Sequence, residues 1–202
     1  MLGSINPLGE RARGSRWGMT VAFFAIGSLA AGALAGAVLG WAGSVALQGV
    51  EPVTRLAAFA LIVFVGTVFD LGLFGARLPS TRRQVNEDWL GRYRGWVVGV
   101  GFGAQLGVGV ATIVTTSAVY ATLAASVLAG SPRAGLLIGT AFGAARALSL
   151  FGAAGADDPA SVAALDARFR RWEEPARMGA VAAQVTLAAA AAAAALALAA
   201  TA

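Results

Sequence analysis

The chain has 202 residues, of which 58% are hydrophobic and 12% charged, and its net charge is +5. Soluble proteins contain about 45–50% apolar and about 25% charged residues. Cysteine and histidine are both absent, which excludes thiolate chemistry, disulfides and the usual ligands of zinc, copper, haem and iron–sulfur sites. We therefore expect an all-α polytopic membrane protein, not an enzyme, with no metal and no cofactor.

Apolar stretches separated by short polar segments predict five transmembrane helices, because a helix needs about 20 apolar residues to cross the hydrocarbon. They form one transmembrane domain covering residues 1–202, with spans at about 17–46, 52–74, 96–120, 134–153 and 178–200. The third apolar stretch continues beyond residue 120, and we expect a kinked or interfacial extension there. The fifth contains eight consecutive alanines, residues 188–195.

The basic residues, all of them arginine, are distributed unevenly among the connecting segments. The N-terminal segment has three, residues 77–94 have five and residues 155–177 have four, whereas the other two connections have one each. This alternation follows the positive-inside rule. We expect a multi-pass protein of the plasma membrane, with a cytoplasmic N-terminus and the lipid bilayer, not nucleic acid, as partner of the arginines.

Both arginine-rich connections are predicted to be amphipathic helices on the cytoplasmic side. Ser80 is suited to begin the first helix, and Asp158 followed by Pro159 is a start signal for the second. Two interpretations remain open: the helices lie on lipid phosphates, or they pack on the protein's own base. The residues expected at the membrane surface are Arg82, Arg83, Trp89, Arg92, Arg94, Arg170, Arg171 and Trp172.

Small residues recur every four positions in three of the spans. This spacing places them on one helix face, where backbones can approach closely. We expect the faces to pack within a compact bundle, and self-association through one of them is the alternative. The glycines concerned are Gly32, Gly36, Gly40, Gly99, Gly103, Gly139 and Gly143.

Polar side chains inside the spans are the candidate functional groups, because a charge at bilayer depth normally faces a partner or water. Asp70 and Arg146 either pair with each other or reach separately to the interface. The threonines of the third span either bend the helix or line a hydrophilic path, and Gln184 is a candidate partner for Gln105. A polar pocket in the bundle would be lined by Asp70, Gln105, Thr112, Thr115, Thr116 and Arg146.

Three sequence stretches resemble the transmembrane family of cytochrome c biogenesis and thiol–disulfide interchange proteins and the related small-solute exporters. Residues 101–117 resemble the helix that opens the family's second repeat, residues 139–146 the next helix, and residues 5–10 the tail of the helix that opens the first. The resemblance implies a 3+3 inverted repeat with a truncated first helix. The family's redox cysteines are missing near Thr112–Ser117, so disulfide exchange is excluded.

Two functions follow from these patterns. The first is a non-redox protein that carries or gates a small solute through the polar pocket. The second is a structural or accessory subunit of a larger membrane complex, with the glycine faces and amphipathic helices as docking surfaces for a second copy or another subunit. The sequence does not choose between them.

Overall fold

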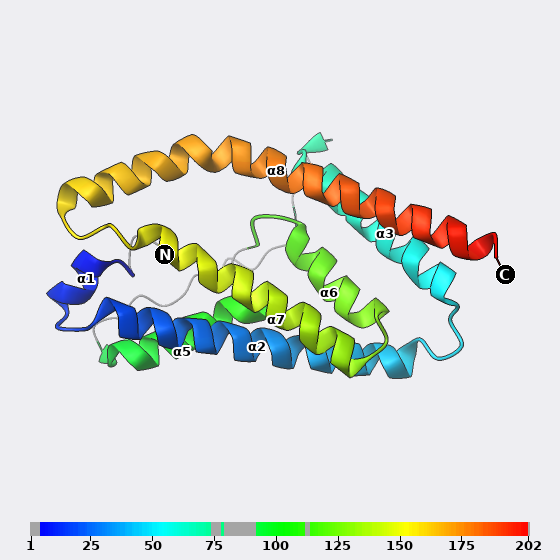
Figure 1. Cartoon of the computed structure of the whole chain (residues 1–202), viewed down its shortest axis with the longest axis horizontal. Helices are drawn as coiled ribbons and strands as arrows, with labels where there is room; N and C mark the ends of the chain where they lie inside the picture. Colours follow the sequence, from blue (N-terminus) through cyan, green and yellow to red (C-terminus); the bar gives the residue numbers. More distant parts are fainter. Residues whose placement is uncertain (1–4, 74–77, 79–91, 112–113, 202) are drawn as a thin grey trace. The chain divides into compact units, whose positions relative to one another are not determined.

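The structure is a computed structural model that describes residues 5–73, 78, 92–111 and 114–201, and within these residues it contains helices and no strands (Figure 1). The all-helical prediction is therefore confirmed for the described residues. Within the described residues, four helical segments are long and apolar enough to cross a membrane, which supports a membrane protein. The helices of this part of the chain are α1 (Pro7–Ala12), α2 (Trp17–Ala46), α3 (Pro52–Asp70), α5 (Gly95–Val108), α6 (Ala118–Leu128), α7 (Pro132–Leu148), η2 (Ser149–Ala153) and α8 (Pro159–Ala199).

The first two spans have the bounds that the sequence leads one to expect. Helix α2 covers residues 17–46, as predicted, and α3 begins at Pro52, where the fixed φ of proline suits a first helical turn. Helix α3 ends at Asp70, before Gly72, whose φ of 68° ends the helical path. The predicted end of this span at residue 74 lies outside the described residues.

The third span differs from the prediction of one helix over residues 96–120. The structure has two shorter helices, α5 and α6, and the described residues between them, 109–111 and 114–117, are not helical. The break begins at Gly109, which has a φ of 85°, a conformation that favours glycine. At about 1.5 Å per residue, neither helix alone reaches the roughly 30 Å of a hydrocarbon core. Five continuous spans are therefore not observed in the described chain.

The fourth span agrees with the prediction to within two residues, because α7 begins at Pro132 and the 3-10 helix η2 continues to the predicted end at Ala153. The last helix is much longer than predicted. The expected amphipathic helix over residues 155–177 and the span over 178–200 form one helix, α8, which runs through Pro175. The other amphipathic helix, after Ser80, falls almost entirely on residues 79–91, outside the described part.

The chain divides into two compact units, each described here by itself. The first unit contains α1, α5 and η2 with parts of α2, α7 and α8. Its core joins α2 to α5 through Phe24, Val98 and Phe102, and the fully buried Ile5 packs into the same cluster. Residues 5–10, expected to be the tail of a truncated helix, therefore include a core residue and the first turn of the short helix α1.

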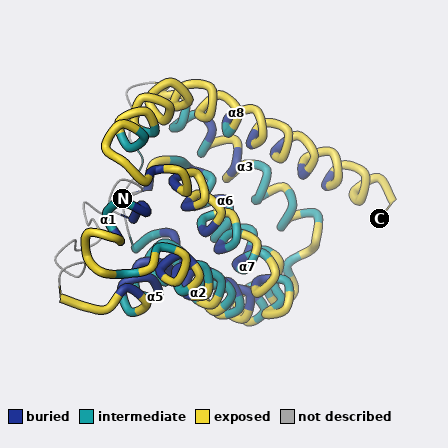
Figure 2. Tube along the Cα trace, turned by 60° about the vertical axis from the view of Figure 1, so that its left-hand side comes forward, coloured by how far each residue is buried: buried dark blue, intermediate teal, exposed yellow. Residues whose placement is uncertain are grey.

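The second unit contains α3 and α6 with the remaining parts of α2, α7 and α8. Its core is formed by Val63 of α3, Ala121 of α6 and Ala188 of α8, with Phe59 against them. Figure 2 shows that burial on α8 is confined to scattered positions while most of the helix is exposed. Exposed apolar helix surface is expected where a helix faces lipid.

Glycines allow close backbone packing within each unit. In the second unit, a methyl carbon placed on Gly36 would lie 2.1 Å from the carbonyl oxygen of Gly135, so α2 and α7 approach at backbone distance. In the first unit, a methyl carbon on Gly103 would lie 2.1 Å from the carbonyl oxygen of Phe24, and one on Gly143 2.3 Å from that of Ser28. In both units the small residues form contact surfaces between helices.

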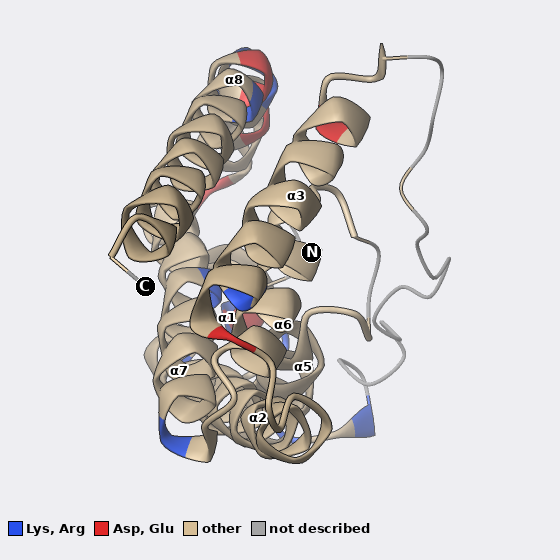
Figure 3. Cartoon of the chain, turned by 90° about the vertical axis from the view of Figure 1, so that its right-hand side faces the viewer, with Lys and Arg blue, Asp and Glu red and all other residues tan. Residues whose placement is uncertain are grey.

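Charged side chains are sparse along the helices of the described chain. Figure 3 shows uncharged ribbon over most of their length, with acidic and basic residues gathered near helix ends and on the first part of α8. That distribution suits helices embedded in lipid, where ionisable groups are costly unless they are paired or face water.

Candidate functional site

A cluster of polar side chains surrounds Asp70 in the second unit. Its carboxylate accepts hydrogen bonds from the backbone N–H of Ser117 at 2.8 Å and from the hydroxyl of Thr116 at 2.8 Å. The Ser117 hydroxyl also lies 2.8 Å from Oδ2 of Asp70. The last residue of α3 is thus bound to the residues that precede α6, and both carboxylate oxygens have donors.

Gln184 of α8 completes the cluster. Its Nε2 donates to Oδ2 of Asp70 at 2.8 Å, and its Oε1 lies 3.1 Å from the hydroxyls of both Thr67 and Ser117. Each hydroxyl has one hydrogen, so Ser117 donates either to Asp70 or to Gln184. Gln184 is only 5% exposed and Thr67 4%. The amide therefore satisfies its buried donor and acceptor within the cluster.

Ser117 can approach α3 closely because residue 66 is a glycine. A methyl carbon at Gly66 would lie 2.7 Å from Oγ of Ser117 and 2.8 Å from its Cβ. Thr67, one residue later, directs its hydroxyl to the carbonyl oxygen of Val63 or to Gln184. Residues 66, 67 and 70 of α3 therefore form one side of the cluster.

The arrangement compensates for the break between α5 and α6. A helix that begins inside a bundle leaves its first N–H groups without intrahelical partners, and in apolar surroundings such groups must be satisfied by the protein. Asp70 binds the N–H of Ser117, and the Thr116 hydroxyl lies 3.3 Å from the N–H of Ala118. A carboxylate at a helix N-terminus is also favoured by the helix dipole. Asp70 thus caps α6 from another helix.

The structure brings together two of the six residues predicted to line a polar pocket. Asp70 and Thr116 are bonded, whereas Thr115, in the same segment, is exposed. Thr112 lies outside the described residues. Gln105 and Arg146 belong to the first unit, so the proposed pocket stays a prediction. The sequence grouped Ser117 with the threonines and predicted Gln184 as a partner for Gln105, but neither was placed in the pocket, and Thr67 was missed. In the structure Gln184 binds Asp70, and Thr67 and Ser117 lie at hydrogen-bond distance from its amide oxygen.

Arg146 lies in the last turn of α7, in the first unit. Its guanidinium carbon is 5.3 Å from the ring centroid of Phe142, one turn earlier, which is cation–π distance. Its Nε is buried and has no hydrogen-bond partner among the described residues. Because such a group carries a desolvation cost, Arg146 remains a candidate for an interaction that the described residues do not supply.

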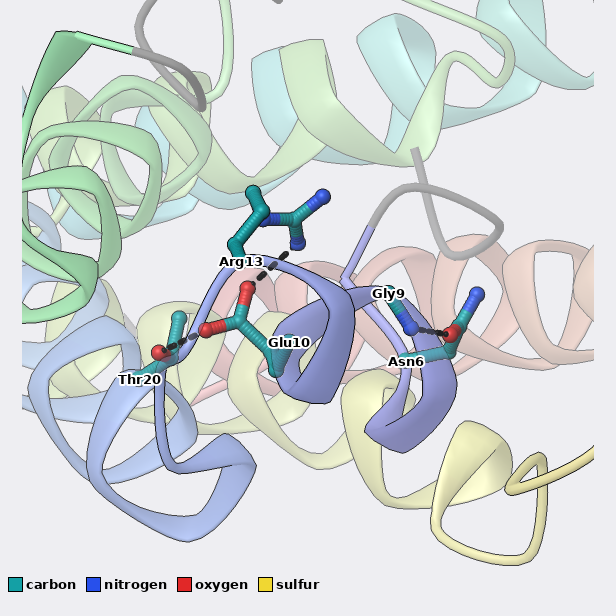
Figure 4. A network of polar contacts seen from close by, with 5 residues as sticks. All are labelled: Asn6, Gly9, Glu10, Arg13 and Thr20. Carbon is teal, nitrogen blue, oxygen red and sulfur yellow. Dashed lines mark hydrogen bonds and ion pairs between the residues drawn. The ribbon is translucent and has the colours of Figure 1, made fainter.

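The first unit contains a second polar network, around Glu10 (Figure 4). The Glu10 side chain is 2% exposed; its carboxylate accepts from Arg13 at 2.5 Å and from the Thr20 hydroxyl at 2.6 Å. Asn6 caps α1 by accepting from the N–H of Gly9 at 2.7 Å, as asparagine commonly does. The network therefore ties α1 to the first turn of α2.

Of the residues expected at the membrane surface, those in the described part are exposed. Arg92 and Arg94 lie just before α5, with Arg94 as its N-cap residue. Arg170, Arg171 and Trp172 lie on α8. Arg170 is ion-paired with Asp166 one turn earlier, and Trp172 is 58% exposed. Arg82, Arg83 and Trp89 lie outside the described residues. Contact with lipid stays a prediction for all of them.

Comparison with known proteins gives two informative similarities. The chain is 35% identical over 108 residues to the methylamine utilization protein MauF of Paracoccus versutus, which covers 54% of this chain and 38% of that protein. It is 32% identical over 127 residues to MauF of Methylorubrum extorquens, covering 63% of this chain and 43% of that protein. The chain thus matches less than half the length of either relative. No protein-family profile and no solved structure matches.

Proposed function

We propose that the chain is a membrane-embedded accessory protein that supports the utilization of a small amine such as methylamine. The similarity to MauF from two bacteria carries this proposal. It supports the accessory-subunit hypothesis more than solute transport, since the name of the relatives describes participation in a metabolic system. In this reading the protein acts by binding partner proteins at the plasma membrane, with its N-terminus in the cytoplasm.

The Asp70 cluster supports the same proposal. The carboxylate receives donors from Thr116, Ser117 and Gln184, and Gln184 uses both its donor and its acceptor there. Fully bonded polar groups rigidify a structure, whereas a solute site would need polar groups left available to the solute. The cluster therefore holds α3, α8 and the segment before α6 together, as a structural role requires.

The resemblance to the cytochrome c biogenesis and thiol–disulfide interchange family remains a proposal, and it concerns only the arrangement of the helices. The break between α5 and α6 falls within residues 109–117, in the stretch matched to the family's cysteine-bearing helix. Because the chain contains no cysteine, electron transfer through a thiol pair is not part of the proposed function.

Two measurements test the accessory role. We expect the tagged chain, extracted in mild detergent, to copurify with a stoichiometric partner identified by mass spectrometry. We also expect deletion of its gene to impair growth on methylamine, and the wild-type chain to restore growth. Purification of the chain alone together with unimpaired growth would reject the proposal. Solute flux in proteoliposomes that is lost in Arg146→Ala would instead favour transport.

A further inference from the structure

We propose that the first unit carries a binding site for the headgroup of an anionic phospholipid, in a hollow at the starts of α2 and α5. The hollow has a volume of about 680 Å³ and is lined by four arginines, Arg13, Arg16, Arg92 and Arg94. Its described lining contains no aspartate or glutamate. The ligand chemistry that this charge selects is a phosphate group, because guanidinium forms paired hydrogen bonds with phosphate oxygens.

Among the described residues of the first unit, the positive charge of the hollow is only partly neutralised. In the described part of the chain, the one ion pair that involves these arginines joins Arg13 to Glu10 (Figure 4). Glu10 is buried and bonded to Thr20, and its Oε2 would lie 3.3 Å from a methyl carbon on Gly95 at the edge of the hollow. It therefore holds Arg13 in place, while Arg16, Arg92 and Arg94 are exposed and have no carboxylate within ion-pair distance among the described residues.

Two helices begin at the hollow. Helix α2 starts at Trp17, directly after Arg16, and α5 starts at Gly95 with Arg94 as its N-cap residue, which makes no side-chain capping bond. A methyl carbon on Gly95 would lie 2.7 Å from the Thr20 hydroxyl, so the two starts are adjacent. Helix N-termini present N–H groups and a positive partial charge, which adds to the attraction that the arginines exert on an anion.

The surroundings of the hollow favour a lipid over free phosphate. Met19, Tyr93 and Trp96 also line it and are 44%, 52% and 43% exposed. Tryptophan and tyrosine are enriched at the level of lipid headgroups, and α2 is long and apolar enough to span the bilayer from that point. A phosphodiester in the hollow would leave its acyl chains along the apolar surfaces of α2 and α5.

The test is the retention of lipid by the whole chain. The protein is reconstituted in nanodiscs of phosphatidylcholine containing phosphatidylglycerol, extracted, and examined by native mass spectrometry. We expect wild type to keep phosphatidylglycerol in preference to phosphatidylcholine. The double variant Arg16→Gln/Arg94→Gln should bind phosphatidylglycerol about ten-fold or more weakly. The control Arg133→Gln/Arg168→Gln, which removes the same charge at two exposed positions outside the hollow, should bind as wild type does.

Three outcomes would overturn the proposal: equal retention by wild type and the double variant, equal loss in the control, or displacement of the lipid by millimolar inorganic phosphate. The last result would assign the hollow to a free anion. Thermal unfolding of each variant shows whether it is folded. If the double variant fails to fold, Arg16→Gln alone provides the comparison, since this exposed residue lies outside the helices. None of these outcomes depends on amine utilization, so they are separate from the proposed function.

Discussion

Asp70, the last residue of α3, accepts a hydrogen bond from the backbone N–H of Ser117, 2.8 Å from its Oδ1. The two residues are 47 positions apart, and the bond caps the start of α6 with a charge from a different helix. It joins a helix end to a helix start in the second unit. The interruption of the third apolar stretch is therefore stabilised by a partner outside that stretch.

We expect Asp70→Asn to destabilise the protein by about 1–3 kcal/mol. The amide oxygen can still accept from Ser117, but the amide nitrogen would replace Oδ2, which now accepts from Nε2 of Gln184, and would bring two donors together. The measurement is thermal unfolding in detergent. Asp166→Asn, which alters an exposed pair with Arg170 on α8, should change stability by less than about 0.5 kcal/mol. Equal effects of the two variants would contradict a stabilising role for the bond between Asp70 and Gln184.

A second prediction concerns the contact of α2 with α7. Gly36→Ala would place a methyl carbon 2.1 Å from the carbonyl oxygen of Gly135. Backbone cannot move aside cheaply, so we expect a loss of about 1–3 kcal/mol from overpacking. Gly179→Ala is the matched control, because nothing lies within 4 Å of the new methyl group on α8 and alanine favours a helix by about 1 kcal/mol. Opposite shifts in unfolding temperature are expected; a stabilised Gly36→Ala would refute the contact.

The long spans could be predicted from the sequence, whereas the polar cluster around Asp70 could not. The bounds of α2 follow from an uninterrupted apolar stretch between Arg16 and a polar break, and hydrophobic length is a local property. The threonines before α6 were compatible with either a bend or a cavity, and a break begins at Gly109. The bond between Gln184 and Asp70 spans 114 positions, and such pairing depends on how helices pack, which no local pattern in one sequence specifies.

The Glu10 network gives a third prediction. We expect Arg13→Ala to destabilise the chain by about 1–3 kcal/mol, because it removes the cationic partner of a buried carboxylate; the Arg13 side chain is 27% exposed, which limits the loss. Glu10→Gln should lower the free energy of unfolding less in the Arg13→Ala variant than in the wild type, because the ion pair is already broken there. The measurement is a double-mutant cycle on thermal unfolding, and additive effects would show that the pair contributes nothing. Arg11→Ala, exposed on the same helix, is the control.

The start of α8 should become less stable in acid because of Asp158. The Asp158 carboxylate accepts from the N–H of Ser161 at 2.7 Å, and the Ser161 hydroxyl accepts in return from the N–H of Asp158 at 3.1 Å. The first of these bonds holds the pKa of Asp158 below its ordinary value of 3.8. The folded pKa is thus lower than the unfolded one. The stabilisation is therefore fully present above the unfolded pKa and is lost as the pH falls through the folded pKa.

Hydrogen exchange of peptides covering residues 158–168, corrected for intrinsic rates, measures this effect between pH 6 and pH 2. We expect protection at the first turn of α8 to be constant above about pH 5 and to fall at lower pH. Asp158→Asn keeps a capping side chain but cannot titrate, so its protection should no longer depend on this carboxyl. Asp157→Asn leaves the bond to Ser161 in place and should retain the wild-type pH dependence. If Asp157→Asn removed that dependence and Asp158→Asn preserved it, the titrating group would be Asp157, and the capping interpretation would be wrong.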